Sequence, residues 1–140
     1  MSQKSKITKL KFQNQEYTLN FIESSQVKEG VTCDVYSIQE TDAFDLGVVF
    51  VEKGKSTPNQ KVLKGEKTFE IFEQGEGSLI INKGQTDEEV YAFSEESENM
   101  EITVNINQTM QWQASDGSDL MFYEICYPPY QDGRFENIEE

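Results

Sequence analysis

The sequence predicts an all-β protein, either a sandwich or a jelly-roll barrel. About ten short strand-like runs follow one another at a spacing of roughly 8–12 residues, separated by Gly, Pro, Asn and Asp. Several runs alternate apolar and polar residues, as strands with one buried face do. No segment has a convincing amphipathic-helix pattern, and this combination is typical of sandwiches and barrels.

The expected strands of the first half are rich in Val, Ile, Phe, Tyr and Leu, and they are 7–12, 17–21, 32–38 and 44–52. Residues 23–30 are polar and predict a loop with room for one helical turn. Gly47, inside the strongest of these runs, indicates a bulge or a close approach of another backbone.

The expected strands of the second half have the same character, and they are 60–64, 67–74, 78–82, 90–93, 100–106, 109–114 and 119–127. Pro128 and Pro129 end the last of them. The tail, 131–140, is polar, although Phe135 and Ile138 could pack back on the barrel.

A tight turn is predicted at Gly75-Glu76-Gly77, between the Phe-rich run 67–74 and the apolar run 78–82. Glycine adopts a positive φ without steric cost, which hairpin turns need. We expect this hairpin to lie at the centre of the fold.

The charge excludes two classes of partner. The chain has 26 acidic and 12 basic residues, a net charge of −14, which repels nucleic-acid phosphates and anionic membranes. The basic cluster Lys4, Lys6, Lys9 and Lys11 is interpreted as a solvated face of a first strand or arm. With no apolar leader or span either, we expect a cytoplasmic protein. Cys33 and Cys126 are expected to be buried thiols rather than a disulfide framework.

The absence of histidine is the strongest constraint on function. It removes the commonest general base and the commonest transition-metal ligand. Ser-His-Asp and Cys-His nucleophile systems and any histidine-built zinc or iron site are therefore excluded.

Residues 54–129, roughly half the chain, resemble the cupin family in strand pattern and turns. The first cupin motif has a glycine, a histidine pair, a glutamate and a second glycine. Gly75 matches that second glycine, and Thr68 stands at the glutamate position. The histidine positions fall on Lys61 and Leu63, or one residue later on Val62 and Lys64.

The second cupin motif, a proline, a glycine and a histidine, aligns with the run that begins at Asn107. Asn107 stands at the proline, Thr109 at the glycine, and Trp112 or Gln111 at the histidine.

An immunoglobulin-like sandwich is the rival fold, but its Cys…Trp…Cys spacing is absent.

A length of 140 residues indicates a single domain, 1–140. The resemblance implies that it is a cupin-type jelly-roll, or double-stranded β-helix, barrel. Additional N-terminal strands occupy 1–40, the barrel core 44–130 and the polar tail 131–140. No metal ligand of the family is kept, so we expect a metal-free protein without a cofactor. Carboxylates could bind Ca²⁺ or Mg²⁺, but they cluster in loops, where a solvated surface is expected.

The motif positions define the candidate ligand pocket in the barrel mouth, and its residues are Lys61, Leu63, Thr68, Glu70, Gln111, Trp112 and Tyr123. Trp112 either stacks on a ligand or fills the space of the missing metal. Thr68, Glu70 and Phe72 share one strand face, but both faces mix apolar and charged residues, so the buried face stays open. A Lys61–Glu70 pair is either an acid–base pair or a surface salt bridge.

Three functions follow, and no catalytic residue is assigned. The first is a metal-free binding or interaction module, a homodimer through its N-terminal strands, with a small-molecule ligand. The second is a metal-independent enzyme, isomerase- or lyase-like, on a sugar-like or cofactor-like substrate, using Glu70, Lys61 or Tyr123. The third is a structural or assembly accessory whose acidic surface meets a basic partner.

Overall fold

The fold is described from a computed structural model, which covers residues 7–63, 67–97, 100–129 and 135–138. Lys4, Lys6 and Lys64, named above, lie outside these residues. The strands of the described chain are β1 (Lys9–Phe12), β2 (Gln15–Lys28), β3 (Val31–Ile38), β4 (Asp45–Val51), β5 (Gln60–Val62), β6 (Lys67–Gly75), β7 (Gly77–Ile81), β8 (Glu89–Phe93), β9 (Glu101–Asn105), β10 (Thr109–Ala114), β11 (Leu120–Tyr127) and β12 (Phe135–Asn137). No helix long and apolar enough to cross a membrane occurs in this part of the chain.

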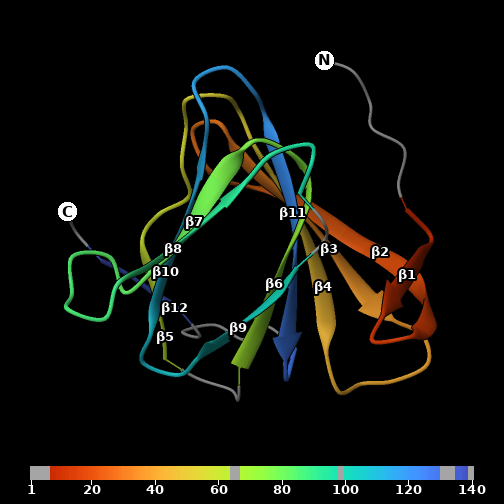
Figure 1. Ribbon diagram of the computed structural model, residues 1–140. Coiled ribbons are helices and arrows are strands. Elements are labelled where there is room, and N and C mark those ends of the chain that lie inside the picture. Colours follow the sequence, from red (N-terminus) through yellow and green to blue (C-terminus); the bar gives the residue numbers. More distant parts are fainter. Residues whose placement is uncertain (1–6, 64–66, 98–99, 130–134, 139–140) are drawn as a thin grey trace.

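The strands form two curled antiparallel sheets, which confirms the jelly-roll barrel (Figure 1). The seven-stranded sheet has the order β1-β2-β3-β4-β11-β6-β9, and the five-stranded sheet the order β12-β5-β10-β7-β8. From β4 onward the chain passes repeatedly from one sheet to the other, which brings the inner faces together. The apolar residues between them form the barrel core, which includes Val31, Leu79, Ile81, Val104, Trp112 and Phe122.

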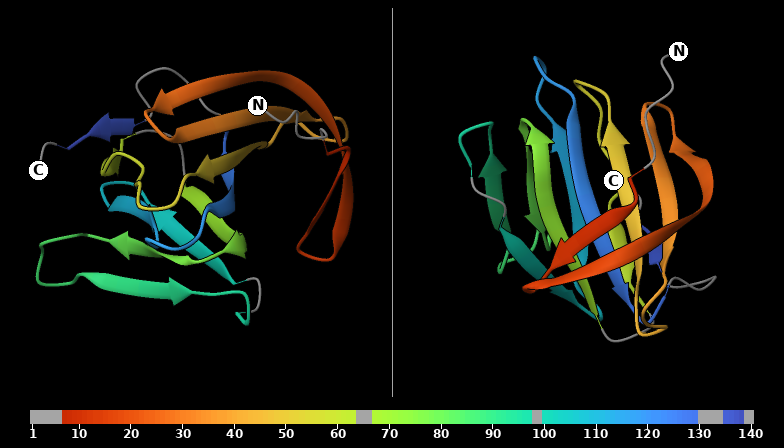
Figure 2. Two further views of the ribbon diagram at one scale, coloured as in Figure 1. Left: turned by 90° about the horizontal axis from the view of Figure 1, so that it is seen from above. Right: turned by 90° about the vertical axis from the view of Figure 1, so that its right-hand side faces the viewer.

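A second apolar core lies on the outer face of the seven-stranded sheet. Figure 2 shows β1 and the first half of β2 bending round to cross the outer face of this sheet. Leu10 and Phe12 of β1 are buried there against Phe69 and Ile125, and the rings of Phe12 and Phe69 are 5.5 Å apart. The turn after β1 reaches the far edge, where Gln13 Nε2 donates to Glu101 Oε2 at 3.0 Å. The N-terminal strands therefore cover the sheet rather than simply extend it.

The expected loop at 23–30 is wrong, because β2 continues to Lys28. Its second half pairs with β3 across two register shifts, between Phe21 and Glu23 and between Gln26 and Lys28. No apolar alternation marks this half, since its side chains face solvent or a polar cavity and not the core. A short strand in the tail, β12, was also not predicted; it pairs with β5.

The hairpin at Gly75-Glu76-Gly77 is confirmed, with Gly75 at φ +99°. A Cβ on Gly75 would stand 1.9 Å from the carbonyl oxygen of Asp119, and one on Gly77 would stand 2.2 Å from that of Gln113. β6 and β7 thus meet where the backbones of Asp119, just before β11, and of Gln113 on β10 leave no room for a side chain.

Gly75→Ala is expected to lower the free energy of unfolding by at least about 2 kcal/mol, because it adds positive-φ strain and a backbone overlap. Gly84→Ala is the matched control: φ is +80° there but nothing lies within 4 Å, so a loss of about 1 kcal/mol is expected. Urea denaturation of both variants measures the difference. Equal losses would contradict the close approach of the Asp119 carbonyl.

Candidate functional site

A cavity of about 460 Å³ lies inside the barrel, beside the apolar core. Its walls come from both sheets and from the connection between β4 and β5. Its polar lining residues are Glu23, Ser25, Cys33, Asp45, Thr57, Gln60, Glu124, Cys126 and Asn137. Its apolar lining includes Val31, Val35, Val49, Met110, Trp112 and Phe122. Such a volume suits a small organic molecule.

One row of side chains crosses the seven-stranded sheet beneath this cavity. Directly opposed residues run from Val35 through Gly47, Glu124 and Glu70 to Ile102. Opposed residues share a face, and Val35 and Gly47 line the cavity while Ile102 belongs to the barrel core. Thr68, Glu70 and Phe72 therefore form the inner face of β6. This settles which face of β6 points into the barrel, which the sequence left open.

Glu70 is fully buried, and its carboxyl group has one strong partner. The indole Nε1 of Trp112 donates to Glu70 Oε1 at 2.8 Å. The second oxygen, Oε2, has no hydrogen-bond donor among the described residues if both Glu70 and Glu124 are ionised, because a carboxylate only accepts. Glu124 stands directly opposite on β11, and a proton on one of the two carboxyl groups would supply that donor.

The surroundings raise the pKa of Glu70 well above its usual range. Burial is the main cause, followed by the negative charge of Glu124 and a hydrogen bond with Glu124. The hydrogen bond from Trp112 acts in the opposite direction and is outweighed. Glu70 is thus the neutral member of a carboxyl pair, which we define as Glu70 and Glu124.

Trp112 is held in a column of stacked rings. Its ring lies 4.2 Å from that of Phe122 and 5.6 Å from that of Phe93, which stacks in turn on Phe72. The indole is only 2% exposed and already stacks on two rings, so Trp112 is a core residue and not a stacking platform. Only part of it contributes to the cavity wall, and its N–H holds the carboxyl pair in place.

Asp45 and two thiols, those of Cys126 and Cys33, also line the cavity beside Glu124. Asp45 and Cys126 are opposed on β4 and β11, two positions along from Gly47 and Glu124. On β3, the pKa of the Cys33 thiol is raised to about 12 by burial and by the charges of Glu124, Asp34 and Asp45. The thiol is therefore protonated at neutral pH and is not a thiolate nucleophile.

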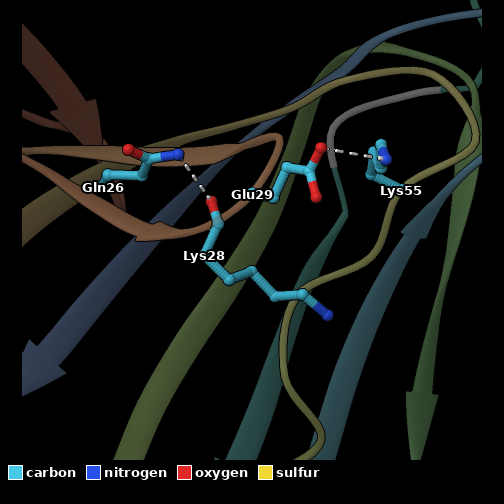
Figure 3. Close-up of polar contacts among 4 residues, drawn as sticks. All are labelled: Gln26, Lys28, Glu29 and Lys55. Atoms are coloured by element: carbon cyan, nitrogen blue, oxygen red, sulfur yellow. Dashed lines mark hydrogen bonds and ion pairs between the residues drawn. The ribbon is translucent and has the colours of Figure 1, made fainter.

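The cavity wall is fastened where the β4–β5 connection crosses β10. Trp112 N donates to Thr57 Oγ1, and Gln111 Nε2 donates to the Thr57 carbonyl, both at 2.9 Å. Further out, Lys55 Nζ lies 3.9 Å from Glu29 Oε2 in the β2–β3 turn (Figure 3). That pair is largely solvated and adds little stability.

The seven residues expected in the pocket are dispersed. Trp112 lines the cavity, while Glu70 and Thr68 lie fully buried in the wall beside Glu124 and Cys126. Gln111 is buried, with Lys83 Nζ donating to its Oε1 at 2.9 Å. The other three do not line the cavity, and they are Lys61, Leu63 and Tyr123.

Each of these three has a physical reason to lie elsewhere. Lys61 is on β5, in the sheet opposite Glu70, so the Lys61–Glu70 pair on neighbouring strands is wrong. Leu63 follows β5 and is 41% exposed. Tyr123 packs on the outer face, where burial and the charge of Glu73 raise its pKa to about 12.

Glu124 is the site residue that sequence reasoning missed. It is a single charge within the apolar run Met121 to Cys126, and an isolated carboxylate in such a strand marks a buried polar contact. Glu23 and Asp45 gave no comparable signal. Glu23 begins a polar run that predicts a loop, and Asp45 stands next to the first residue of its expected strand.

The residues at the family's metal positions do not fit a metal. Thr68 and Trp112 offer a hydroxyl and an N–H donor, and Leu63 has no ligating atom. In the part of the chain that the structure describes, no group of three or more Asp, Glu or Cys side chains is placed to hold a metal ion. No step is therefore assigned to a metal.

The architecture matches solved structures closely enough to name the fold. Over 81% of this chain and 82% of the other, it superposes on a cupin-like protein from Thermotoga maritima with a TM-score of 0.58 and 13% identity. This chain has a cupin fold. No protein-family model matches the sequence, and no curated protein matches it.

Two other cupin-fold structures are similar. A variant of Streptomyces PAC13 with uridine matches 88% of this chain and 89% of its own, with a TM-score of 0.60 and 15% identity. The capsular polysaccharide assembling protein CapF from Staphylococcus aureus matches 89% of this chain with a TM-score of 0.65 and 13% identity. The chain spans only 35% of CapF. At these identities the likeness concerns the fold.

The carboxyl pair predicts an unusual pH dependence of stability. A raised pKa in the folded state favours folding at low pH, and that contribution is lost as pH rises from about 4.5, the ordinary value, through the folded pKa. Glu70→Gln keeps an acceptor for Trp112 and a donor for Glu124, so this loss should vanish in the variant. Each unit of pKa difference corresponds to about 1.4 kcal/mol.

Urea denaturation of wild type and Glu70→Gln at about pH 5 and about pH 8 measures this effect. Glu89→Gln, at an exposed position of β8, is the control and should follow wild type. If Glu70→Gln loses stability relative to wild type as the pH rises, Glu70 is ionised in the folded protein and the interpretation is wrong.

Proposed function

We propose that this chain is a binding module that takes up a small, hydroxyl-bearing organic molecule in the barrel cavity. The observation that carries the proposal is the lining: a cavity of about 460 Å³ with many hydrogen-bond acceptors and an apolar wall. Hydroxyl groups of a sugar-like or nucleoside-like ligand would donate to Glu124, Asp45 and Gln60. The apolar side would pack against Val49 and Met110.

The similar structures support this proposal without deciding it. One of them is described with uridine, and another is described as a capsular polysaccharide assembling protein. Both descriptions involve molecules rich in hydroxyl groups. An anionic ligand is disfavoured, because three carboxyl side chains line the cavity and the whole chain carries −14.

A blocking substitution at the rim tests the cavity as the binding site. Ser25, on the exposed half of β2, lines the cavity and lies opposite Cys33. Ser25→Trp should reduce affinity at least about tenfold while leaving the core unchanged. Gln26→Trp points to the other side of the same strand and should bind as wild type.

The measurement is protein-observed NMR with a panel of neutral monosaccharides and nucleosides, with thermal unfolding as a check on folding. Ligand at about 100 times its dissociation constant stabilises by about 2.7 kcal/mol. Binding that is equally weakened by both Trp variants, or by neither, would place the ligand outside this cavity. A panel without any binder would overturn the proposal.

A metal-independent enzyme is the second candidate, and one observation favours it. Glu124 lines the cavity and is opposed by Glu70, which is buried and neutral. The proton-accepting carboxylate of Glu124 therefore lies next to the protonated carboxyl group of Glu70. An acid–base role on a bound substrate is compatible with that arrangement. Loss of turnover in Glu124→Gln with retained ligand binding would distinguish this function from binding alone.

We also propose a homodimer through the N-terminal strands. β1 is an edge strand of the seven-stranded sheet, and Phe21 and Ile22 of β2 are 42% and 56% exposed. An open edge beside exposed apolar side chains is suited to pairing with a second chain.

Ile22→Glu should convert the dimer to a monomer, because it places a charge in the proposed interface. Light scattering coupled to size-exclusion chromatography gives the mass. Val90→Glu, at a position that is 57% exposed on the other sheet, should leave the mass unchanged. A monomeric wild-type protein would refute the homodimer.

A further inference from the structure

The cavity concentrates negative charge from three strands. Glu23 of β2, Asp45 of β4 and Glu124 of β11 line it, and its described lining includes no Lys or Arg. Asp45 and Glu124 are half-buried, whereas Glu23 lies on the exposed half of β2. A partly buried charge interacts more strongly than one in water, since the effective dielectric constant is lower. The carboxyl groups of Asp45 and Glu124 therefore favour a ligand that brings positive charge.

The environment of Glu70 indicates which member of the carboxyl pair is negatively charged. It is fully buried in the wall, and Trp112 Nε1 holds its Oε1 at 2.8 Å. Its other oxygen, Oε2, is buried and has no donor as long as Glu70 and Glu124 are both ionised. One of these two opposed carboxyl groups therefore has to carry a proton. Because Glu70 has no contact with water and Glu124 reaches the cavity, the proton belongs on Glu70 and the negative charge on Glu124.

Gly47, opposed to Glu124 on β4, lines the cavity without a side chain. A Cβ there would stand only 3.1 Å from Cys33 Sγ, so the thiol already closes the space beside Gly47. A ligand group therefore has to approach Glu124 from the cavity that Glu124 itself lines.

We propose that the ligand of this cavity carries an ammonium group, which forms an ion pair with the carboxylate of Glu124 while neutral Glu70 holds that carboxylate in position. The inference rests on the proposed function and narrows its ligand class to hydroxyl-bearing amines. Hydrogen bonds between ionised partners are stronger than neutral ones, so the amine dominates the discrimination among otherwise similar ligands.

A series with one sugar ring tests this directly. The probes are glucosamine, glucose and N-acetylglucosamine, titrated by protein-observed NMR at about pH 6, where the amine is protonated. Glucosamine should bind at least about tenfold more tightly than the other two, and added salt should reduce the difference. Glu124→Gln should abolish the preference, and exposed Glu89→Gln should keep it.

Asp45→Asn serves as a second variant should Glu124→Gln fail to fold, and it should reduce the preference without abolishing it. Equal binding of the three sugars overturns the ammonium inference and leaves the proposed function standing. The same holds if the sugars fail while a neutral nucleoside binds in a way that Ser25→Trp blocks. Failure of every probe overturns both.

Discussion

The carboxyl group of Glu70 is enclosed completely by protein, so its neighbours have to satisfy a group that water cannot reach. Trp112 satisfies one oxygen from the opposite sheet. Glu124 lies directly opposite on the adjacent strand, and its negative charge disfavours ionisation of Glu70. This contact joins the two sheets across the barrel, and it fixes both the rotamer of Trp112 and the protonation of the pair.

The remaining interior is arranged around that link. The rings of Phe122 and Phe93 stack on the indole, whose N–H donates to Glu70. On one side of this column the barrel is filled with apolar side chains, whereas on the other side polar groups and Gly47 leave a cavity. The ring column occupies the position where the family resemblance expects a metal ligand. The space for a ligand is therefore displaced towards β2, β3 and β4.

Much of the fold was predictable because most strands bury one face and keep a regular apolar pattern. The run 44–52, the hairpin at Gly75 and the strand 119–127 appear as expected. β6 could not be oriented from its sequence, because both of its faces are buried: Phe69 lies under the N-terminal strands and Glu70 inside the barrel. The second half of β2 could not be recognised, since a strand between solvent and a polar cavity has no apolar periodicity.

The candidate site was less predictable for a related reason. Its acidic residues come from strands far apart in the sequence, and only the register of the sheet brings Gly47, Glu124 and Glu70 into one row. Motif positions pointed to Lys61 and Leu63, which belong to the other sheet or to the chain after it. A family motif fixes positions along the chain, but without its ligands it no longer indicates where the space inside the barrel lies.

The single tryptophan has a practical consequence. Because the chain has 1 Trp and that residue is buried, all indole emission originates at one point inside the barrel. The emitting ring lines part of the cavity and is hydrogen-bonded to Glu70. The intensity and wavelength of Trp112 fluorescence are therefore sensitive both to cavity occupancy and to the ionisation of Glu70. Both can be followed in the unlabelled protein.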